Sequence, residues 1–175
     1  MLSLGRDLMP SKELEALFSN YLALARKAKD ERRFVFNHLC IRVESLDDAA
    51  QLLSRSFGLA TFLSPGGATF EGEREYRVSW LSGHDAYMEL SEFESAQRIG
   101  YDTGVGQPIG HLSEVGFFVP SMEEALAHLT PLGWYVTSQI DAPNAKMYKI
   151  FNDQVKGFPV ELIDIIDLEA PNFLS

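Results

Sequence analysis

The sequence has few of the features that are typical of secreted and membrane proteins, namely paired cysteines, long apolar runs and a signal peptide. Of its 175 residues, Cys40 is the one cysteine, so no disulfide can form within the chain. No stretch comes near the roughly 20 consecutive apolar residues of a membrane span. Residues 1–6 lack the apolar run of a signal peptide. We therefore expect a cytoplasmic protein that is not embedded in a membrane.

Basic residues are also scarce. The chain has 15 lysines and arginines against 25 aspartates and glutamates, which gives a formal charge of −10, and it contains no run of basic residues. Most of such a surface would repel a polyanion, so nucleic acid is excluded as an expected partner. The charge leaves a small-molecule substrate open as a partner.

What the sequence does contain begins with a helical pattern. From Ser11 to about Arg33, apolar residues recur at spacings of three and four, and basic residues close the segment, as suits the negative end of a helix. The apolar residues of the pattern are Leu14, Leu17, Phe18, Tyr21, Leu22 and Leu24. We predict an N-terminal helix that packs on the body of the protein as a structural extension.

An internal repeat organises the rest of the chain. When residues 38–49 are aligned with residues 114–125, the two segments match in type from Val43 and Val119 onward. Each segment is typical of a strand that runs into a helix capped by a serine, Ser45 or Ser121. An acid three places after each serine is typical of a capping box. The same alignment places a glycine, expected as a left-handed C-cap, after each helix: Gly58 and Gly133.

Three further strand-like segments follow each helix. Their ranges are 60–63, 75–81 and 86–92 in the first half, and 134–139, 146–151 and 159–165 in the second. Tyr148-Lys149 in the second half echoes Tyr76-Arg77 in the first. The pattern predicts two paired βαβββ modules of the α+β class. The predicted N-terminal helical extension, first module, connector loop, second module and tail span residues 1–34, 35–94, 95–111, 112–167 and 168–175.

The repeat aligns residues that can bind a metal. His38 and Glu89 lie on the first and last strands of one module, and Glu114 and Glu161 occupy the equivalent places in the other. Four such side chains would point into one cavity and form an open octahedral site. Because three carboxylates repel one another, either a divalent cation neutralises them or some remain protonated with raised pKa values. Oxygen-rich ligation favours Mn²⁺, Mg²⁺, Fe²⁺, Co²⁺ or Ni²⁺ over Zn²⁺.

The sequence resembles the vicinal oxygen chelate superfamily, which includes glyoxalase I, methylmalonyl-CoA epimerase, extradiol dioxygenases and bleomycin-binding proteins. The resemblance rests on the doubled pattern together with His38 in Asn-His-Leu-Cys-Ile-Arg-Val, Glu89 in Met-Glu-Leu and Glu161 in Val-Glu-Leu-Ile. It covers everything except the N-terminal helix and the tail. It implies a cupped, mixed β-sheet, the glyoxalase/bleomycin resistance/dioxygenase fold, with the N-terminal helix added. It also implies a divalent metal held by the first and last strands of both modules.

At one position the chain departs from the implied pattern. Relatives commonly hold the metal with His, Glu or Gln, His and Glu, whereas this chain has Glu114 where the second His is expected. His111 is the alternative fourth ligand, although strand alternation sends residues 111 and 114 to opposite faces unless a bulge intervenes. Glu114 is also compatible with a lineage that lost the metal and kept the fold.

Three further residues are candidates for substrate binding. Arg42 lies four residues after His38, where the resemblance to glyoxalase I implies an arginine that holds a substrate anion. A salt bridge from Arg42 to one of the glutamates is the alternative. Tyr148 and Lys149 occupy the strand before Glu161, and one of the two is expected to face the cavity.

The resemblance implies a metal-dependent isomerase or lyase that moves a proton α to the carbonyl of a small substrate through a metal-bound enolate. Glu161 is the first choice of catalytic base, and Glu89 or Glu114 is the second. The modules pair within one chain or across a homodimer, since relatives do both.

Two other functions stay open. One is a non-catalytic binding protein of the bleomycin-resistance type, in which an acidic cavity and aromatic residues hold a cation. The aromatic candidates are Trp80, Tyr87, Trp134 and Tyr148. The other is an extradiol dioxygenase, which is less favoured because that chemistry usually uses two His and one carboxylate, and His38 alone matches the pattern firmly.

Overall fold

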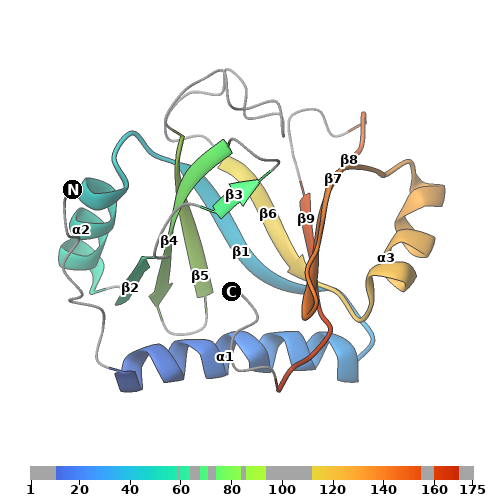
Figure 1. The fold of residues 1–175 in the computed structure, drawn as a ribbon, viewed down its shortest axis with the longest axis horizontal. Coiled ribbons are helices and arrows are strands. Elements are labelled where there is room, and N and C mark those ends of the chain that lie inside the picture. The colour runs from blue at the N-terminus through green and yellow to red at the C-terminus, as the bar shows by residue number, and fades with distance from the viewer. Residues whose placement is uncertain are drawn as a thin grey trace.

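A computed structural model describes residues 11–58, 60–63, 68–70, 74–83, 86–93, 112–154 and 160–169 of the protein. Within these residues the strands form one mixed sheet in the order β2-β4-β5-β1-β6-β9-β8-β7, with β3 paired to β4 (Figure 1). The helices are α1 (Ser11–Asp30), α2 (Leu46–Phe57) and α3 (Met122–Leu129), and a 3₁₀ turn, Thr130–Leu132, follows α3. The strands are β1 (Val35–Arg42), β2 (Ala60–Leu63), β3 (Ala68–Phe70), β4 (Arg74–Gly83), β5 (Ala86–Phe93), β6 (Leu112–Phe118), β7 (Tyr135–Asp141), β8 (Ala145–Phe151) and β9 (Val160–Ile165).

The two halves of the sheet have the same construction. Strand β1 runs parallel to β5, and β6 runs parallel to β9. The halves join where β1 and β6 pair antiparallel. The predicted α+β class, with two βαβββ modules in one mixed sheet and an added N-terminal helix, is confirmed. The short strand β3 is an element that the sequence pattern does not predict.

The predicted boundaries of the parts stay predictions. The connector expected over 95–111 lies outside the described residues, as does most of the tail. Among the helices of the described residues, none is long and apolar enough to cross a membrane.

Both module helices begin at the predicted serine. The Oγ atom of Ser45 accepts a hydrogen bond from the backbone N–H of Asp48 at 3.3 Å, and that of Ser121 accepts one from Glu124 at 3.1 Å. These bonds satisfy N–H groups that the first turn of a helix leaves without a partner. The serine signal therefore locates both helix starts.

The helix ends follow the backbone conformations of a few residues. Gly58 ends α2 in the left-handed conformation, with φ of 67°. In the second module α3 ends earlier, at Leu129, and Gly133, with φ of 86°, closes the 3₁₀ turn. Pro131 within that turn has no N–H to continue the α-helical ladder. Helix α1 stops sooner than expected because Arg32 takes a left-handed φ of 49°.

Helices α2 and α3 pack on one face of the sheet, and α1 packs on the other (Figure 1). The cluster under α2 includes Leu90 and the one under α3 includes Leu162, whereas the cluster under α1 includes Tyr87 and Ile163. Side chains alternate between faces along a strand, so Tyr87 and Ile163 point away from α2 and α3. The predicted N-terminal extension thus covers a face of the sheet that the module helices leave open.

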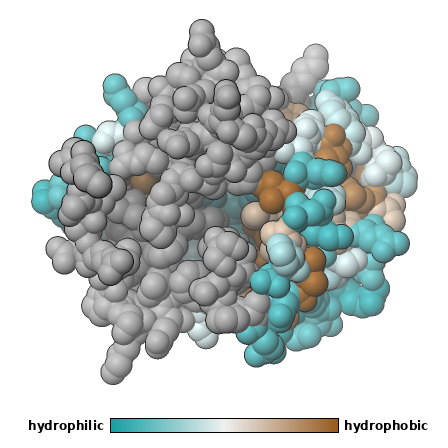
Figure 2. Space-filling view, viewed as in Figure 1, coloured by the Kyte–Doolittle hydropathy of each residue, from teal (hydrophilic) through white to brown (hydrophobic). Residues whose placement is uncertain are grey.

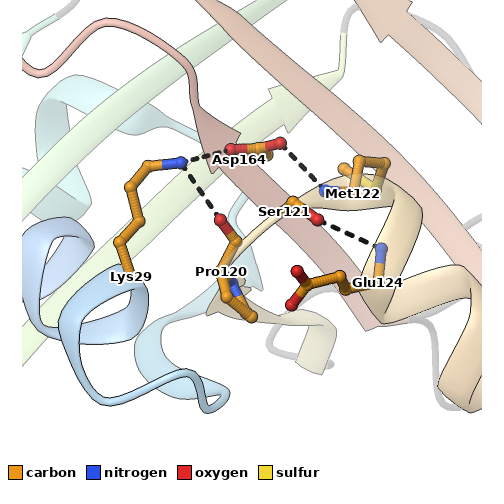
Figure 3. A network of polar contacts seen from close by, with 6 residues as sticks. All are labelled: Lys29, Pro120, Ser121, Met122, Glu124 and Asp164. Atoms are coloured by element: carbon orange, nitrogen blue, oxygen red, sulfur yellow. Dashed lines mark hydrogen bonds and ion pairs between the residues drawn. The ribbon is translucent and has the colours of Figure 1, made fainter.

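A partly buried polar network connects α1 to the second module (Figure 3). The Nζ atom of Lys29 donates to Oδ1 of Asp164 at 2.8 Å and to the carbonyl oxygen of Pro120 at 3.1 Å. The other oxygen of Asp164 accepts the backbone N–H of Met122, the first residue of α3, at 2.9 Å. Buried Asp164 therefore joins α1, β9 and the start of α3.

Figure 2 shows the face that Figure 1 presents. The coloured surface on the right, over the second module, is mostly hydrophilic, with hydrophobic residues interspersed among the polar ones. The exposed apolar residues of this module include Leu132, Tyr135 and Val136. Scattered apolar residues of this kind are ordinary on a protein surface.

Candidate metal centre

The candidate site lies on the central strands β5, β1, β6 and β9. In register, Cys40 pairs with Glu89 in the first module, and Gly116 pairs with Glu161 in the second. Across the junction of the modules, His38 pairs with Gly116. Cys40 and Gly116 are equivalent positions of the repeat, so the repeat extends to the strand register of the site.

Four predicted metal ligands meet in the structure. The Nε2 atom of His38 lies 3.2 Å from Oε2 of Glu89, 3.6 Å from Oε2 of Glu161 and 3.8 Å from Oε1 of Glu114. The side chain of His38 is 0% exposed, and those of Glu114, Glu89 and Glu161 are 5%, 8% and 14% exposed. Three buried or nearly buried carboxylates thus surround one imidazole nitrogen.

Two neighbours hold the imidazole of His38. Its Nδ1 donates a hydrogen bond to Oδ1 of Asn37, which leaves Nε2 directed toward the carboxylates. A Cβ atom at Gly116 would come within 3.0 Å of three ring atoms, so the ring occupies space that only glycine provides. Sequence reasoning missed both residues. The signal for Gly116 was the pair of small residues, Cys40 and Gly116, at equivalent positions of the repeat.

The carboxylates and the imidazole shift one another's pKa values. Burial lowers the pKa of His38, but the surrounding glutamates outweigh it and raise the pKa to about 9. Burial raises the pKa of Glu89 to about 8, and burial with the nearby charge of Glu114 raises that of Glu161 to about 7. The site therefore binds protons tightly around neutral pH.

Glu114 differs from the other two carboxylates because it has a cationic partner. The Nζ atom of Lys149 lies 2.6 Å from its Oε2 atom. Burial alone would raise the pKa of Glu114, but Lys149 and then His38 lower it to about 2. The predicted crowding of like charge is thus relieved in part by a lysine within the site.

The position of Lys149 is decided by register. On β8 it pairs with Glu161, whereas on β4 the residue paired with Glu89 is Trp80. The echo of Tyr148-Lys149 with Tyr76-Arg77 is therefore displaced by three residues, and Trp80, not Arg77, is the equivalent of Lys149. Similar residue types misled the alignment because strand pairing, not local sequence, sets this correspondence.

The residues present fit a divalent metal ion. Donor atoms of His38, Glu89 and Glu114 lie within 4.8 Å of one another, and an oxygen of Glu161 lies near the same imidazole nitrogen. One imidazole nitrogen with several carboxylate oxygens suits a hard or borderline divalent cation. The group formed by His38, Glu89 and Glu114 can therefore hold a metal ion.

The predicted substrate-binding residues have different surroundings. Arg42 is the last residue of β1, is partly exposed and pairs in register with Ser91. The ring of Tyr148 packs in the cluster under α3, and its hydroxyl donates to Oδ1 of Asp141 at 2.9 Å. The structure does not bring Tyr148 to His38, whereas it does bring Lys149 into the site. His111 lies outside the described residues.

Helix α1 contributes a residue next to the site. Tyr21 is 8% exposed, and its ring makes edge contacts with Tyr87 at 5.8 Å and Phe118 at 4.7 Å between centroids. Burial, together with the charges of Glu161 and Glu89, raises the pKa of Tyr21 far above its ordinary value. The expectation of a plain structural extension did not include this proximity.

Comparison with known proteins adds a structural likeness. No family model and no curated protein matches the sequence. Methylmalonyl-CoA epimerase from Mycobacterium tuberculosis superposes with a TM-score of 0.57 at 15% identity, over 73% of this chain and 85% of that chain. A methylmalonyl-CoA epimerase in complex with methylmalonyl-CoA and NH4+ gives 0.59 at 17% identity, over 78% and 97%.

A third similar structure is a glyoxalase I and not an epimerase. A single-residue variant of glyoxalase I from Zea mays superposes with a TM-score of 0.52 at 19% identity, over 73% of this chain and 42% of that chain. Identities this low are informative about the fold alone. The chain has the fold of the vicinal oxygen chelate superfamily, to which methylmalonyl-CoA epimerase and glyoxalase I both belong.

Proposed function

We propose that the protein is a metal-dependent isomerase or lyase that moves a proton α to the carbonyl of a small substrate. The observation that carries the proposal is the convergence of three carboxylates on Nε2 of His38, at 3.2 to 3.8 Å, on one face of the central sheet. Carboxylates concentrated in a nearly buried site serve both to bind a cation and to transfer protons.

The ligands of the proposed metal are His38, Glu89, Glu114 and Glu161. Their oxygen-rich donor set favours Mn²⁺, Mg²⁺, Fe²⁺, Co²⁺ or Ni²⁺ over Zn²⁺. A divalent cation, when bound, supplies positive charge that polarises a carbonyl and stabilises the negative charge developed on its oxygen. The protein holds the ligands by the register of four strands and by the hydrogen bond from His38 to Asn37.

Glu161 is the proposed base. Its side chain is 14% exposed, the most among the four candidate ligands, so a substrate reaches it most readily. In the metal-free protein, burial and the nearby charge of Glu114 raise its pKa to about 7, so the carboxylate of Glu161 is a stronger base there than that of Glu114. Glu114 is a weaker choice because Lys149 holds its pKa near 2, and Glu89 is therefore the second candidate.

A substrate that carries an anionic group is proposed to contact Arg42, which is partly exposed at the end of β1. Two of the solved structures of the same fold are epimerases bound to acyl-CoA compounds, so acyl-CoA thioesters with an acidic α-proton are the first substrates to test. A cytoplasmic location and a homodimer remain parts of the proposal.

The competing function, binding of a cation without catalysis, gains less support. Trp134 and Tyr148 pack in the cluster under α3, and the ring of Tyr87 packs against Tyr21. The side chain of Trp80 is not among those described.

The test is deuterium uptake at the α-carbon. Protein loaded with Mn²⁺ or Co²⁺ is incubated in D₂O with methylmalonyl-CoA and with a panel of small α-hydroxy carbonyl compounds, and incorporation is followed by mass spectrometry. We expect uptake with one class of substrate. Glu161→Gln should reduce the rate by about 10² to 10⁴, as expected for loss of a general base. Glu123→Gln, on the exposed surface of α3, is the control with unchanged rate.

Two results would contradict the proposal. Near-normal uptake by Glu161→Gln would remove Glu161 from the mechanism. Absence of uptake across the panel, together with stoichiometric binding of a cationic aromatic compound, would favour the binding protein instead.

A further inference from the structure

The two carboxylate oxygens of Glu114 have different partners, and one of these partners is Lys149. Its Nζ atom lies 2.6 Å from Oε2, whereas Oε1 lies 3.8 Å from Nε2 of His38. One oxygen is therefore engaged by the ammonium, and the other faces the imidazole and the remaining carboxylates. A carboxylate held in this way offers one oxygen to a cation in the site.

Lys149 also changes the charge of the ligand set. Once metal binding has displaced the protons of His38, Glu89 and Glu161, the three carboxylates and the neutral imidazole carry a charge of −3, and the ammonium of Lys149 reduces this to −2. The side chain of Lys149 is 13% exposed and that of Glu114 is 5% exposed, so water and salt screen the pair only weakly. A net charge of −2 matches one divalent cation.

We propose that Lys149 is a positioning residue that restrains Glu114 to a single metal-facing oxygen and sets the ligand charge at −2, so that the site selects a divalent over a trivalent cation. The inference rests on the metal binding of the proposed function and is independent of its reaction. The register of β8 supports it, because Lys149 pairs directly with Glu161 and lies beside two carboxylates at once. The ion pair also makes Lys149 less available as a substrate contact.

The experiment measures the affinities for Mn²⁺ and Tb³⁺ and compares their ratio among four proteins. These are the wild type, Lys149→Met, Glu114→Gln and the double variant. Both ions prefer oxygen ligands, so their ratio reports the charge of the site. Electron paramagnetic resonance gives free Mn²⁺, and luminescence gives bound Tb³⁺.

Lys149→Met leaves a charge of −3 and should raise the preference for Tb³⁺ over Mn²⁺ by about 10- to 100-fold, as expected for one unit charge at close range. Glu114→Gln leaves −1 and should lower the preference by a similar factor. The double variant replaces an ion pair by two neutral groups, returns the charge to −2 and should restore the wild-type ratio.

Two further variants serve as controls. Lys149→Arg keeps the charge and should keep the ratio. Lys146→Met removes a lysine three residues away on the same strand, on the opposite face, and should leave the ratio unchanged. Lys149→Gln replaces Lys149→Met in the comparison if the latter does not fold, as judged by circular dichroism.

The inference is overturned if removal of the charge at Lys149 leaves the ratio unchanged, if the double variant keeps a shifted ratio, or if the wild type binds neither ion. The deuterium-uptake assay judges the reaction separately. If the Tb³⁺ to Mn²⁺ affinity ratio shifts but no deuterium is taken up, the role of Lys149 is supported and the proposed reaction is contradicted. If deuterium is taken up but the ratio does not shift, the reaction is supported and the role of Lys149 is contradicted.

Discussion

Gly116 faces the imidazole of His38 so closely that a Cβ atom at position 116 would come within 3.0 Å of the ring atoms Cε1, Nδ1 and Nε2. The two residues are register partners across the junction of the modules. Since this contact involves a ring at 0% exposure, the ring has little room to move away.

We predict that Gly116→Ala lowers metal affinity by at least about tenfold, because a shifted imidazole no longer meets the carboxylates at the original geometry. Isothermal titration calorimetry with Mn²⁺ measures the change. Gly133→Ala is the matched control: its φ of 86° makes alanine cost about 1 kcal/mol of stability, but metal affinity should be unaffected. Wild-type affinity in Gly116→Ala would show that His38 does not need this space.

Asn37 should tune the same imidazole from its other nitrogen. Asn37→Ala removes the acceptor of the His38 Nδ1–H bond, and we expect metal affinity to fall about 10- to 100-fold. Asn37→Asp retains an acceptor and should keep most of the affinity. Equal losses in both variants would mean that Asn37 acts through packing alone.

Metal affinity should depend on pH. Protons must leave His38, Glu89 and Glu161 before these groups bind a cation, and their pKa values are about 9, 8 and 7. Affinity should therefore rise between pH 6 and pH 9 with net release of protons, which calorimetry in buffers of different ionisation enthalpy measures. A flat profile would argue against these three residues as ligands.

The stability of the metal-free protein should change in the opposite direction. The folded-state pKa values of His38, Glu89 and Glu161 lie above the unfolded values of 6.5, 4.5 and 4.5, so each contribution is full below the unfolded pKa and is lost as pH rises through the folded one. The melting temperature in chelator should fall from about pH 5 to about pH 9. The depressed pKa of Glu114 contributes constantly in this window and is lost below pH 4.5.

The control for this profile is Glu89→Gln, which removes one titrating group and should flatten the fall in melting temperature. Added Mn²⁺ should raise the melting temperature more at pH 9 than at pH 6. A melting temperature that rises with pH in chelator would contradict the assigned directions.

The network around Asp164 should stabilise the fold. Asp164→Ala removes the partner of Lys29 and the acceptor for the N–H of Met122, and we expect a loss of about 2 to 4 kcal/mol in the free energy of unfolding. Urea denaturation measures it. Arg26→Met is the control, since the ion pair of Arg26 with Glu169 is exposed and should contribute less than about 1 kcal/mol. Equal losses of unfolding free energy in the two variants would contradict the prediction that the Asp164 network stabilises the fold more than an exposed ion pair does.

Much of the fold was predictable because its signals are local. The serine caps at Ser45 and Ser121 mark the starts of both module helices in the sequence, and Gly58 marks the end of α2. Gly133 marks the end of the 3₁₀ turn after α3 and not the end of α3 itself. The sequence pattern did not predict strand β3, because β3 has three residues and is defined by its pairing with β4. Local patterns also aligned Lys149 with Arg77, whereas the register makes Trp80 its equivalent. The residues near Lys149 in the sequence do not determine which residue of the neighbouring strand pairs with it.

The site was predictable only as far as the repeat reached. The alignment brought together His38, Glu89, Glu114 and Glu161, and the structure places their side chains around one nitrogen. Their assignment as metal ligands stays a prediction.

The sequence by itself determined the doubled βαβββ plan, the helix starts and the four residues that the repeat aligns, because periodicity and capping act over a few neighbouring residues. Only the tertiary structure decided which cationic side chain pairs with Glu114, which glycine leaves space for the ring of His38 and which face of the sheet α1 covers. Lys149, Gly116 and Tyr21 are distant in sequence from most of the residues they contact. Strand register and helix docking create those contacts, and no local pattern encodes them.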